Sequence, residues 1–339
     1  MENKTFIIAE LSANHHHDFD LTVKTIEAMA ASGADAVKIQ TYKAESLAMD
    51  IDNAYFGPKQ SGTWKGIRPY DLYKEAAMPY EWQAQLKQIT EKLGMQFFST
   101  PFDFEAVDFL ESLQVPIYKI ASFEINDIPL IRYIAGKGKP IIMSTGVADE
   151  HDIHLALKTC YGAGNYKVAL LKCTSEYPAT IEQANLLTIP DMLQRFKVKV
   201  GVSDHTIGEI VPMVAVGLGA CIVEKHFILS RSMGGPDASF STEPHEFKKM
   251  VEAVRSVEKS LGKINYTVSE ADKAKRRSLF IVNDIKIGEK ATEENIRSLR
   301  SGAGAQPIYY DKILGKRAIK DLKKGEIAYE YFSRFTAFI

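Results

Sequence analysis

The sequence places side chains that could do chemistry at the ends of short apolar runs. Lys38 and Lys119 lie within two such runs, "AVKIQ" and "IYKIAS", where an ammonium group is costly to bury unless it meets an anion. Hydroxyl, amide and carboxyl side chains end these and similar runs: Glu10, Gln40, Thr100, Ser122, Glu124, Ser144, Ser175, Tyr177, Ser203 and Glu224. Lysines combined with hydroxyls are suited to holding a phosphate and a carboxylate. The alternative is that the lysines form structural ion pairs with the glutamates.

Two of the eight histidines also end apolar runs, His205 in "SDHT" and His226 in "EKHF". If these runs are neighbouring strands, the two imidazoles lie side by side. They would then supply two positions of a metal site and leave the others open to water and substrate. The alternative for each is a hydrogen-bonded core histidine.

The scaffold for these side chains is predicted by the rhythm of the chain. Eight β-branched runs alternate with segments of helical periodicity, several of which close at glycine. The runs cover residues 6–11, 36–40, 96–100, 117–122, 140–146, 168–174, 199–204 and 222–227. Eight strand–helix units predict a (β/α)8 TIM barrel, in which catalytic groups come from the carboxyl ends of the strands. The alternative, a doubly wound sheet, is disfavoured because no glycine-rich dinucleotide motif follows the first run.

One connection, residues 43–78, is much longer than the others and rich in aromatic residues, among them Tyr55, Trp64 and Tyr73. Long loops at the carboxyl ends of barrel strands usually cover the catalytic mouth. The alternative is a surface insertion without a role in the site.

The character of the sequence changes after Gly262. Residues 263–278 are polar and basic and are interpreted as a linker. Residues 279–339 contain an internal echo, "DIKIGEKA" (284–291) against "DLKKGEIA" (321–328), which predicts two related β-hairpins in a small β-rich domain. The expected organisation is therefore a catalytic barrel over 1–262, a linker over 263–278 and a small domain over 279–339.

Composition excludes several classes of protein. The chain of 339 residues has 42 basic and 43 acidic side chains and a net charge of −1, so no global field recruits nucleic acid or an anionic membrane. No run approaches the roughly 18 apolar residues of a membrane span, and the N-terminus does not have the pattern of a signal peptide. Three widely spaced cysteines form no CxxC pair. We therefore expect a cytoplasmic protein without nucleic-acid or membrane partners.

Several stretches resemble, in order along nearly the whole chain, the sialic acid synthase family, which condenses phosphoenolpyruvate with an N-acylated amino sugar. They are "IAELSANH", "DAVKIQTY", "FFSTPFD", "YKIASFE", "STG", "CTSEYPA", "GVSDHT" and "EKHF". The stretch "RSLRSGAG" resembles the antifreeze-protein-like SAF (β-clip) domain that follows the barrel in this family. The resemblance implies a carbon–carbon bond-forming transferase.

Within the family, "AELSANH" and "PYDLYKEAAMPYEW" are similar to the branch that uses 2,4-diacetamido-2,4,6-trideoxy-L-altrose. Ser175 stands where enzymes of N-acetylmannosamine typically place a sugar-binding asparagine, which disfavours that sugar. The same chemistry leading to N-acetylneuraminate or legionaminate is the alternative.

The resemblance implies roles for the candidate residues. Phosphoenolpyruvate would be bound by Lys38, Thr100, Lys119, Ser122, Ser144 and Ser203. The sugar would be bound by Glu10, Gln40, Ser175, Tyr177, Asp237 and Arg300. His205 and His226 would bind a divalent cation, with manganese expected and magnesium or cobalt as alternatives. The catalytic set would be Glu10, Lys119 and Glu124, with Glu124 positioning or deprotonating a water.

Two further features follow from the resemblance. Arg300 would reach into the active site of the other subunit of a domain-swapped homodimer, although "RSG" departs from the usual Arg-Pro-Gly. His15 follows the Asn of the family's Asn-His pair, whereas His16 and His17 replace what is usually Asn-Gly. The three histidines are therefore interpreted as a loop at the rim of the active site with no metal.

Two rival functions are kept open. His15 and His17 formally make the HxH pair of a barrel metallohydrolase, but the pair begins four residues beyond Leu11, after the strand has ended. A sugar-binding scaffold on a degenerate barrel is the non-enzymatic rival. It leaves the buried lysines and the paired strand-end histidines without a purpose.

Overall fold

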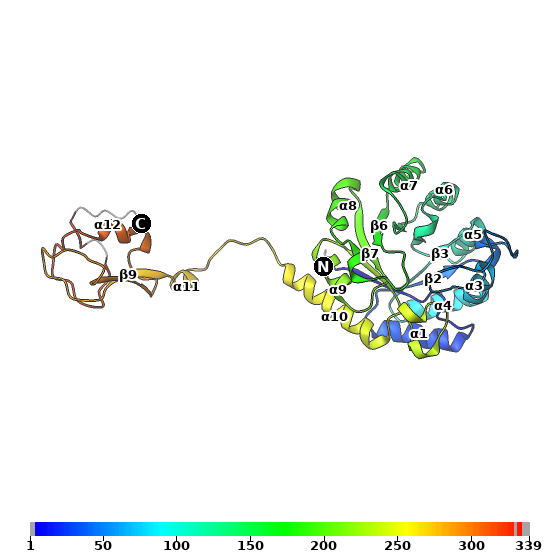
Figure 1. The fold of residues 1–339 in the computed structure, drawn as a ribbon, viewed down its shortest axis with the longest axis horizontal. Helices are drawn as coiled ribbons and strands as arrows, with labels where there is room; N and C mark the ends of the chain where they lie inside the picture. Colours follow the sequence, from blue (N-terminus) through cyan, green and yellow to red (C-terminus); the bar gives the residue numbers. More distant parts are fainter. Residues whose placement is uncertain (1–3, 329–330, 334–339) are drawn as a thin grey trace. The chain divides into compact units, whose positions relative to one another are not determined.

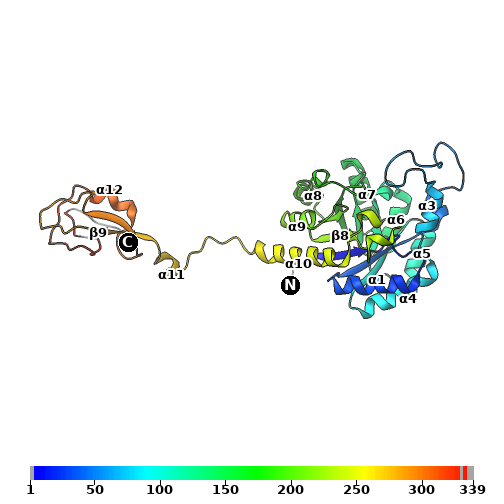
Figure 2. The ribbon, with the colours of Figure 1, turned by 60° about the horizontal axis from the view of Figure 1, so that its bottom comes forward.

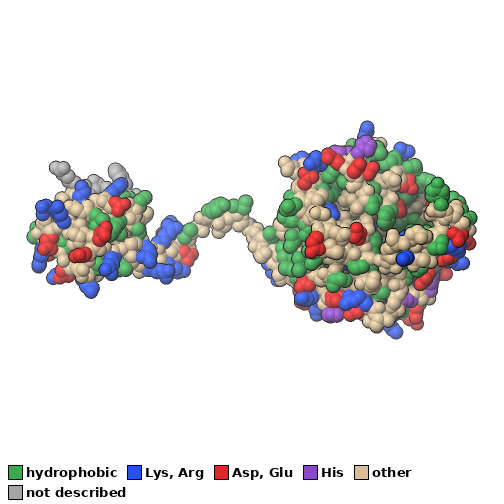
Figure 3. All heavy atoms as spheres, viewed as in Figure 1, with side chains coloured by type: hydrophobic (Ala, Val, Ile, Leu, Met, Phe, Trp, Pro, Cys, Tyr) green, Lys and Arg blue, Asp and Glu red, His purple; other side chains and the backbone are tan. Residues whose placement is uncertain are grey.

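The computed structural model describes residues 4–328 and 331–333. The chain divides into two compact units, Met1–Gly262 and Lys263–Ile339. Figures 1 and 2 show the first unit as strands surrounded by helices and the second as a smaller, mostly irregular body. Among the described residues, no helix is long and apolar enough to cross a membrane. Figure 3 shows acidic and basic side chains interspersed over the visible face of each unit.

The first unit is a closed barrel of eight parallel strands in the order β1 to β8. The strands are β1 (Phe6–Glu10), β2 (Ala36–Thr41), β3 (Gln96–Pro101), β4 (Tyr118–Ile120), β5 (Ile141–Ser144), β6 (Val168–Cys173), β7 (Lys199–Asp204) and β8 (Ile222–His226). Strand β1 pairs with both β2 and β8, which closes the barrel. The predicted TIM barrel is confirmed, and the doubly wound alternative is wrong.

Helices follow the strands and cover the outside of the barrel (Figure 1). They are α1 (Phe19–Ala31), α4 (Tyr80–Lys92), α5 (Phe104–Ser112), α6 (Ile128–Gly136), α7 (Glu150–Gly162), α8 (Thr188–Phe196), α9 (Ile210–Gly217) and α10 (Pro244–Leu261). Aspartates cap four of them, because a side-chain carboxylate satisfies a backbone N–H that the first turn leaves free. These caps are Asp18, Asp103, Asp127 and Asp149.

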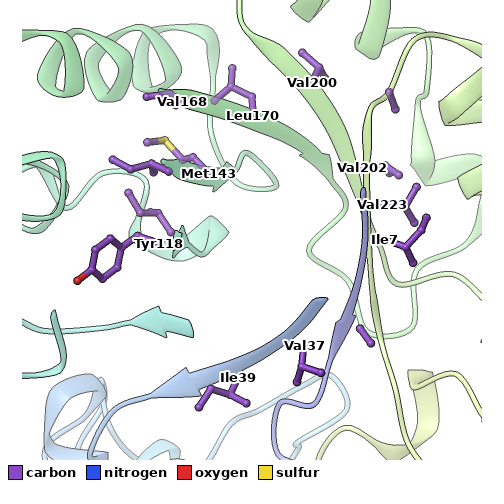
Figure 4. Close-up of a cluster of buried hydrophobic side chains, with 14 of the residues drawn as sticks. Ile7, Val37, Ile39, Tyr118, Met143, Val168, Leu170, Val200, Val202 and Val223 are labelled. Atoms are coloured by element: carbon purple, nitrogen blue, oxygen red, sulfur yellow. The ribbon is translucent and has the colours of Figure 1, made fainter. Parts of the chain in front are cut away.

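Strand alternation sorts the side chains into two layers, since successive side chains point to opposite faces of a strand. Outward-pointing residues such as Ile7, Val37 and Tyr118 pack against the helices in the main hydrophobic core (Figure 4). The intervening residues form a separate apolar cluster inside the barrel: Ile8, Ala36, Phe98, Ile142, Ala169, Leu171 and Ile222. Lys38 and Lys119 share the inward phase, because Lys38 lies two residues after Ala36 and Lys119 pairs with Ile142. The barrel interior is therefore apolar below and polar towards the carboxyl ends of the strands.

The long connection after β2 contains the short helix α2 (Ala44–Leu47) and ends in α3 (Pro69–Ala76). Residues 48–68 between them, all of which are described, form no helix or strand. We call these residues the 48–68 segment.

The second unit contains the antiparallel pair β9 (Arg277–Ile281) and β10 (Ile296–Arg300), with α11 (Glu270–Lys273) before it and α12 (Tyr310–Ile313) after it. The segment expected to be a linker, 263–278, thus contains α11 and the start of β9. The repeated sequences pair with each other instead of forming separate hairpins, through an antiparallel bridge between Ile285 and Leu322. The pairing is reciprocal, since Lys323 donates to Asp284 at 2.8 Å and Lys286 donates to Asp321 at 2.9 Å.

Candidate active site

A buried polar layer lies inside the barrel at the carboxyl ends of its strands. Its members come from seven strands: Glu10, Lys38, Thr100, Lys119, Ser144, Ser203 and Glu224. The strand register brings them together, since Glu10 is opposite Lys38 and Ser203 is opposite Glu224. The structure therefore brings together most of the residues predicted to hold phosphoenolpyruvate.

The two lysines of this layer lie on either side of Glu224. Lys38 forms an ion pair with Glu10, and its Nζ lies 3.8 Å from Glu224 Oε2 and 3.4 Å from Thr100 Oγ1. Lys119 donates to Ser144 Oγ at 2.6 Å, and its Nζ lies 3.9 Å from Glu224 Oε1. The ion pairs foreseen as the alternative exist with Glu10 and Glu224. An anionic ligand could therefore compete with these two carboxylates for the ammonium groups of Lys38 and Lys119.

Burial and like charge change the acidity of this layer. The pKa of Glu10 is raised to about 7, first by burial and then by the nearby Glu224 carboxylate, against the opposing effect of Lys38. Burial also opposes ionisation of Glu224, but Lys119 and Lys38 outweigh it and lower the pKa of that carboxyl. Burial lowers the pKa of Lys119. Of the two carboxylates, Glu10 is therefore the one that can take up a proton near neutral pH.

Ser122 lies just beyond β4, at the start of the 3-10 turn η1 (Ser122–Glu124). Its Oγ accepts a hydrogen bond of 3.1 Å from the backbone N–H of Gly146. A Cβ on Gly146 would lie 2.1 Å from Ser175 Oγ and 2.8 Å from Ser122 Oγ, so only glycine fits there. No role was predicted for Gly146 from the sequence, although a glycine that ends the predicted strand 140–146 was a signal for a close backbone approach.

The two strand-end histidines form a pair, as predicted, with ring centroids 5.2 Å apart. His205 Nδ1 donates to the Thr174 carbonyl at 2.8 Å, which orients the ring, and the same imidazole also interacts with the Cys173 thiol by a side-chain hydrogen bond. His226 Nδ1 is buried and has no hydrogen-bond partner among the described residues. Burial, followed by the positive charge of its neighbours, lowers the pKa of His226 well below its usual range. A neutral imidazole whose ring nitrogen has no hydrogen-bond partner can coordinate a metal cation.

These features fit a cation held by two protein nitrogens. The ring separation allows both imidazoles to reach one ion at ordinary metal–nitrogen distances of about 2.0–2.2 Å. Within the described ranges, no group of three or more histidine, cysteine, aspartate or glutamate side chains is arranged to hold a metal. Water or substrate would therefore fill the remaining positions.

Aromatic rings and polar groups surround the histidine pair. The rings of Tyr177 and Phe240 lie 4.4 Å from His205 and 5.0 Å from His226, respectively. Asp237 Oδ2 lies 3.9 Å from His226 Nδ1, and Gln40 donates to Ser12 Oγ at 3.0 Å. Of the predicted sugar-binding residues, Tyr177 and Asp237 thus lie directly beside the histidines.

The structure describes Glu124 within the barrel, whereas it describes Arg300 only within the second unit. Glu124 ends η1, and its Oε2 is buried without a hydrogen-bond partner among the described residues. Burial raises the pKa of Glu124 to about 7, although the positive charge of Lys119 opposes the rise. Arg300 belongs to the second unit, where it ends β10 and is exposed. Its role in a partner subunit stays a prediction.

Two of the three consecutive histidines hold the end of the long connection. His15 Nε2 donates to the Ala76 carbonyl at 3.1 Å, and His17 Nε2 donates to the Glu75 carbonyl at 2.9 Å. His15 Nδ1 in turn accepts from the His17 backbone N–H at 3.1 Å. Burial lowers the pKa of His15 to about 4, so the ring stays neutral. Both Nε2 atoms are engaged by carbonyl groups, which argues against a metal-binding HxH pair.

The chain is similar to one protein family and to several named synthases. The NeuB family matches residues 25–266, and the SAF domain matches residues 276–330. A pseudaminic acid synthase of Helicobacter pylori is 44% identical over 321 residues, which cover 94% of each chain. An N,N'-diacetyllegionaminic acid synthase of Legionella pneumophila is 36% identical and covers 94% of this chain and 92% of its own. A crystal structure of an N-acetylneuraminic acid (sialic acid) synthetase from Leptospira borgpetersenii, in complex with citrate, has a TM-score of 0.71 at 32% identity and covers 80% of this chain and 90% of that one.

Proposed function

The chain belongs to the NeuB family, and on that premise we propose that it acts as a pseudaminic acid synthase. The proposed reaction condenses phosphoenolpyruvate with 2,4-diacetamido-2,4,6-trideoxy-L-altrose and water to give pseudaminic acid and phosphate. The observation that carries the proposal is the buried layer of Lys38, Lys119 and hydroxyl groups beside the His205–His226 pair. Anion-holding and metal-holding groups then share one barrel mouth.

The polar layer suits phosphoenolpyruvate because of its charge. Without a ligand, the ammonium groups of Lys38 and Lys119 are balanced by Glu10 and Glu224. A bound carboxylate and phosphate would compete with Glu10 for Lys38. Glu10, whose pKa is raised to about 7, would then take up a proton instead of remaining a buried, unpaired charge. Ser122, Ser144 and Ser203 would donate to the remaining ligand oxygens.

The reaction forms one carbon–carbon bond and breaks one carbon–oxygen bond. The methylene carbon of phosphoenolpyruvate attacks the sugar aldehyde, whose oxygen takes up a proton. Positive charge develops at the central carbon of phosphoenolpyruvate, and water adds there with loss of a proton. The resulting hemiketal phosphate expels inorganic phosphate and leaves the 2-keto acid. Lys38 and Lys119 hold the ligand charges throughout, and Glu124 positions or deprotonates the water.

A divalent cation on His205 and His226, manganese with magnesium or cobalt as alternatives, would polarise the aldehyde as a Lewis acid. The protein's part is to orient the rings. The Thr174 carbonyl fixes the His205 ring, and Tyr177 and Phe240 pack beside the pair.

The choice of sugar is supported by the identity to the H. pylori enzyme, 44%, against 36% to the legionaminic acid synthase. Legionaminate or N-acetylneuraminate formation is the second candidate. The sequence resemblance also supports a domain-swapped homodimer with Arg300 acting in the partner's site, and a cytoplasmic location stays a prediction.

The test is phosphate release from phosphoenolpyruvate in the presence of manganese with each of three sugars. These are 2,4-diacetamido-2,4,6-trideoxy-L-altrose, the corresponding legionaminic acid precursor and N-acetylmannosamine. Release with the altrose sugar alone would support the proposal. Release with another sugar would keep the chemistry and reject the proposed substrate. No release with any of them would reject the synthase.

A further inference from the structure

The 48–68 segment reaches across the barrel mouth from the end of β2. Its tip is a tight reversal, since Lys59 N–H donates to the Ile67 carbonyl at 3.1 Å and Gly66 N–H donates to the Lys59 carbonyl at 2.8 Å. Its base is held by Arg68, which donates to Asp50 at 3.0 Å and to both carboxylate oxygens of Asp71. The segment therefore has a defined shape although it contains no helix or strand.

The tip contacts two loops that follow distant strands. Thr63 Oγ1 donates to the Tyr177 carbonyl, beyond β6. Trp64 Nε1 donates to the Pro236 carbonyl, beyond β8, at 3.0 Å. These contacts join residues 114 and 172 positions apart in the sequence. The tip thus spans the mouth of the barrel.

Trp64 is not a core residue. It belongs to none of the hydrophobic clusters formed by the part of the chain that the structure describes. Lys59 Nζ lies 4.8 Å from the ring centroid of Trp64, and Lys59 has no ion-pair partner among the described residues. The ring also lies 5.7 Å from that of Tyr177. The Trp64 ring is held at a loop tip by one cation, one hydrogen bond to a backbone carbonyl and the Tyr177 ring, so packing in the core does not explain its position.

The position of the Trp64 ring indicates its role. Tyr177 lies between Trp64 and the histidine pair, with its ring 4.4 Å from His205 and 6.5 Å from His226. Phe240 extends the same aromatic wall, 5.0 Å from Tyr177. Phosphoenolpyruvate offers little apolar surface to such a wall, and its proposed ligands are in the polar layer inside the barrel. A 6-deoxy sugar with two acetamido groups does offer apolar C–H faces and methyl groups.

We propose that Trp64 is a sugar-binding residue and that the 48–68 segment closes over the bound sugar. Closure packs the indole and the Tyr177 ring on the deoxy carbon and acetamido methyl groups, so the wall selects deoxygenated, diacylated amino sugars over more hydroxylated ones. The inference rests on the proposed function and extends it to a residue outside the predicted set. The tip must lift to admit the sugar, which is feasible because its side-chain hydrogen bonds to the rest of the barrel, among the described residues, are those to the Tyr177 and Pro236 carbonyls.

Fluorescence gives a direct test, because the chain has two tryptophans, Trp64 and Trp82. In a Trp82→Phe variant, Trp64 is the sole indole reporter. The probe is the altrose sugar after borohydride reduction, which removes the aldehyde and prevents turnover. We expect this probe, added with phosphoenolpyruvate and manganese, to change the Trp64 emission, and phosphoenolpyruvate with manganese alone to leave it unchanged. No change with the sugar probe would overturn the proposal.

Kinetics separate a binding role from a structural one. Trp64→Leu should raise the KM for the sugar about tenfold, as expected for the loss of one aromatic contact. The KM for phosphoenolpyruvate should stay within about twofold and the melting temperature should not change, since the tip packs against no core. Trp64→Phe should recover part of the loss. Tyr55→Leu, an 86% exposed aromatic of the same segment, is the matched control and should match the parent.

The outcomes distinguish this inference from the function on which it rests. If the unsubstituted protein releases phosphate but Trp64→Leu has an unchanged sugar KM, the inference alone is wrong. If the unsubstituted protein releases no phosphate with any sugar of the panel, the proposed function fails and takes the inference with it.

Discussion

Lys225 Nζ lies 2.5 Å from Asp204 Oδ2, and this buried ion pair borders both members of the histidine pair. Asp204 precedes His205, and Lys225 precedes His226. The same ammonium donates to the Thr206 carbonyl at 2.5 Å, and Asp204 Oδ1 accepts from the backbone N–H and the hydroxyl of Thr206 at 2.9 and 2.8 Å. The turn that carries His205 is therefore fastened to the strand that carries His226.

Breaking this pair should weaken both the fold and the metal site. Lys225→Met leaves Asp204 buried without a counter-charge, for which we expect a loss of about 3–5 kcal/mol in the free energy of unfolding. Where the variant remains folded, calorimetric titration should show weaker manganese binding because the His205 turn is released. Lys249→Met breaks the exposed pair with Glu209 and should leave the free energy of unfolding nearly unchanged, because solvent screens such pairs. Unchanged manganese affinity in folded Lys225→Met would contradict the positioning role.

The histidine assignments predict opposite metal phenotypes for two pairs of substitutions. His205→Asn with His226→Asn should abolish manganese binding, since these are the proposed protein ligands. His15→Gln with His17→Gln should retain it and lower the melting temperature, because their ring nitrogens hold the Ala76 and Glu75 carbonyls. Metal content after dialysis and calorimetry measure both effects. Metal loss in the second variant but not in the first would favour the hydrolase.

The raised pKa of Glu124 should make the free energy of unfolding depend on pH. Burial raises the pKa of Glu124 from its ordinary value of 4.5 to about 7, so between these values the folded protein binds more protons than the unfolded chain. Glu124 therefore favours folding most below about pH 4.5, and this contribution declines as the pH rises to about 7. Glu124→Gln should remove the decline and gain up to about 3 kcal/mol relative to the parent at pH 8. Urea unfolding of both proteins from pH 5 to pH 8 measures the difference, which should be smallest at pH 5.

Adding a single methyl group at Gly146 should impair both stability and ligand binding. In Gly146→Ala the new Cβ would meet Ser175 Oγ and Ser122 Oγ, so the backbone or both hydroxyls must shift. We expect a cost of about 1–3 kcal/mol in stability and weaker phosphoenolpyruvate binding by calorimetry. Adding Ser175→Gly removes the closer of the two contacts and should restore part of the stability. No recovery in the double variant would place the strain elsewhere.

If Arg300 acts in the partner's site, two variants that are each inactive should recover activity when their subunits form mixed dimers. Arg300→Ala and Lys119→Met should each lose most activity. Random co-assembly of the two should restore about a quarter of the parental rate, because half of the dimers are mixed and each mixed dimer has one intact site. Arg297→Ala, exposed on the same strand, is the control and should be active alone. No recovery on co-assembly would show that Arg300 does not act in trans.

Much of the fold could be predicted because hydrophobic periodicity and helix-ending glycines are local properties of the chain. The alternation of β-branched runs with glycine-terminated helices was sufficient to predict eight strands. Strand β4 is shorter than predicted, because residues 122–124 turn into η1 and carry Ser122 and Glu124 off the strand. The internal echo was also visible, but its two copies pair with each other, a choice that only packing in the second unit could make.

The sequence by itself determined which groups enter the barrel interior, because strand parity assigns Lys38 and Lys119 to the inward face once the strands are recognised. It also indicated that two histidines end adjacent strands. Only the tertiary structure decided their partners: Lys38 with Glu10, Lys119 with Ser144, Lys225 with Asp204, and His15 with the end of α3. It alone brought Trp64 to the loops beyond β6 and β8. The physical reason is that spacing along the chain encodes the direction of a side chain, whereas a hydrogen-bond partner is chosen by barrel closure and loop packing between residues far apart in sequence.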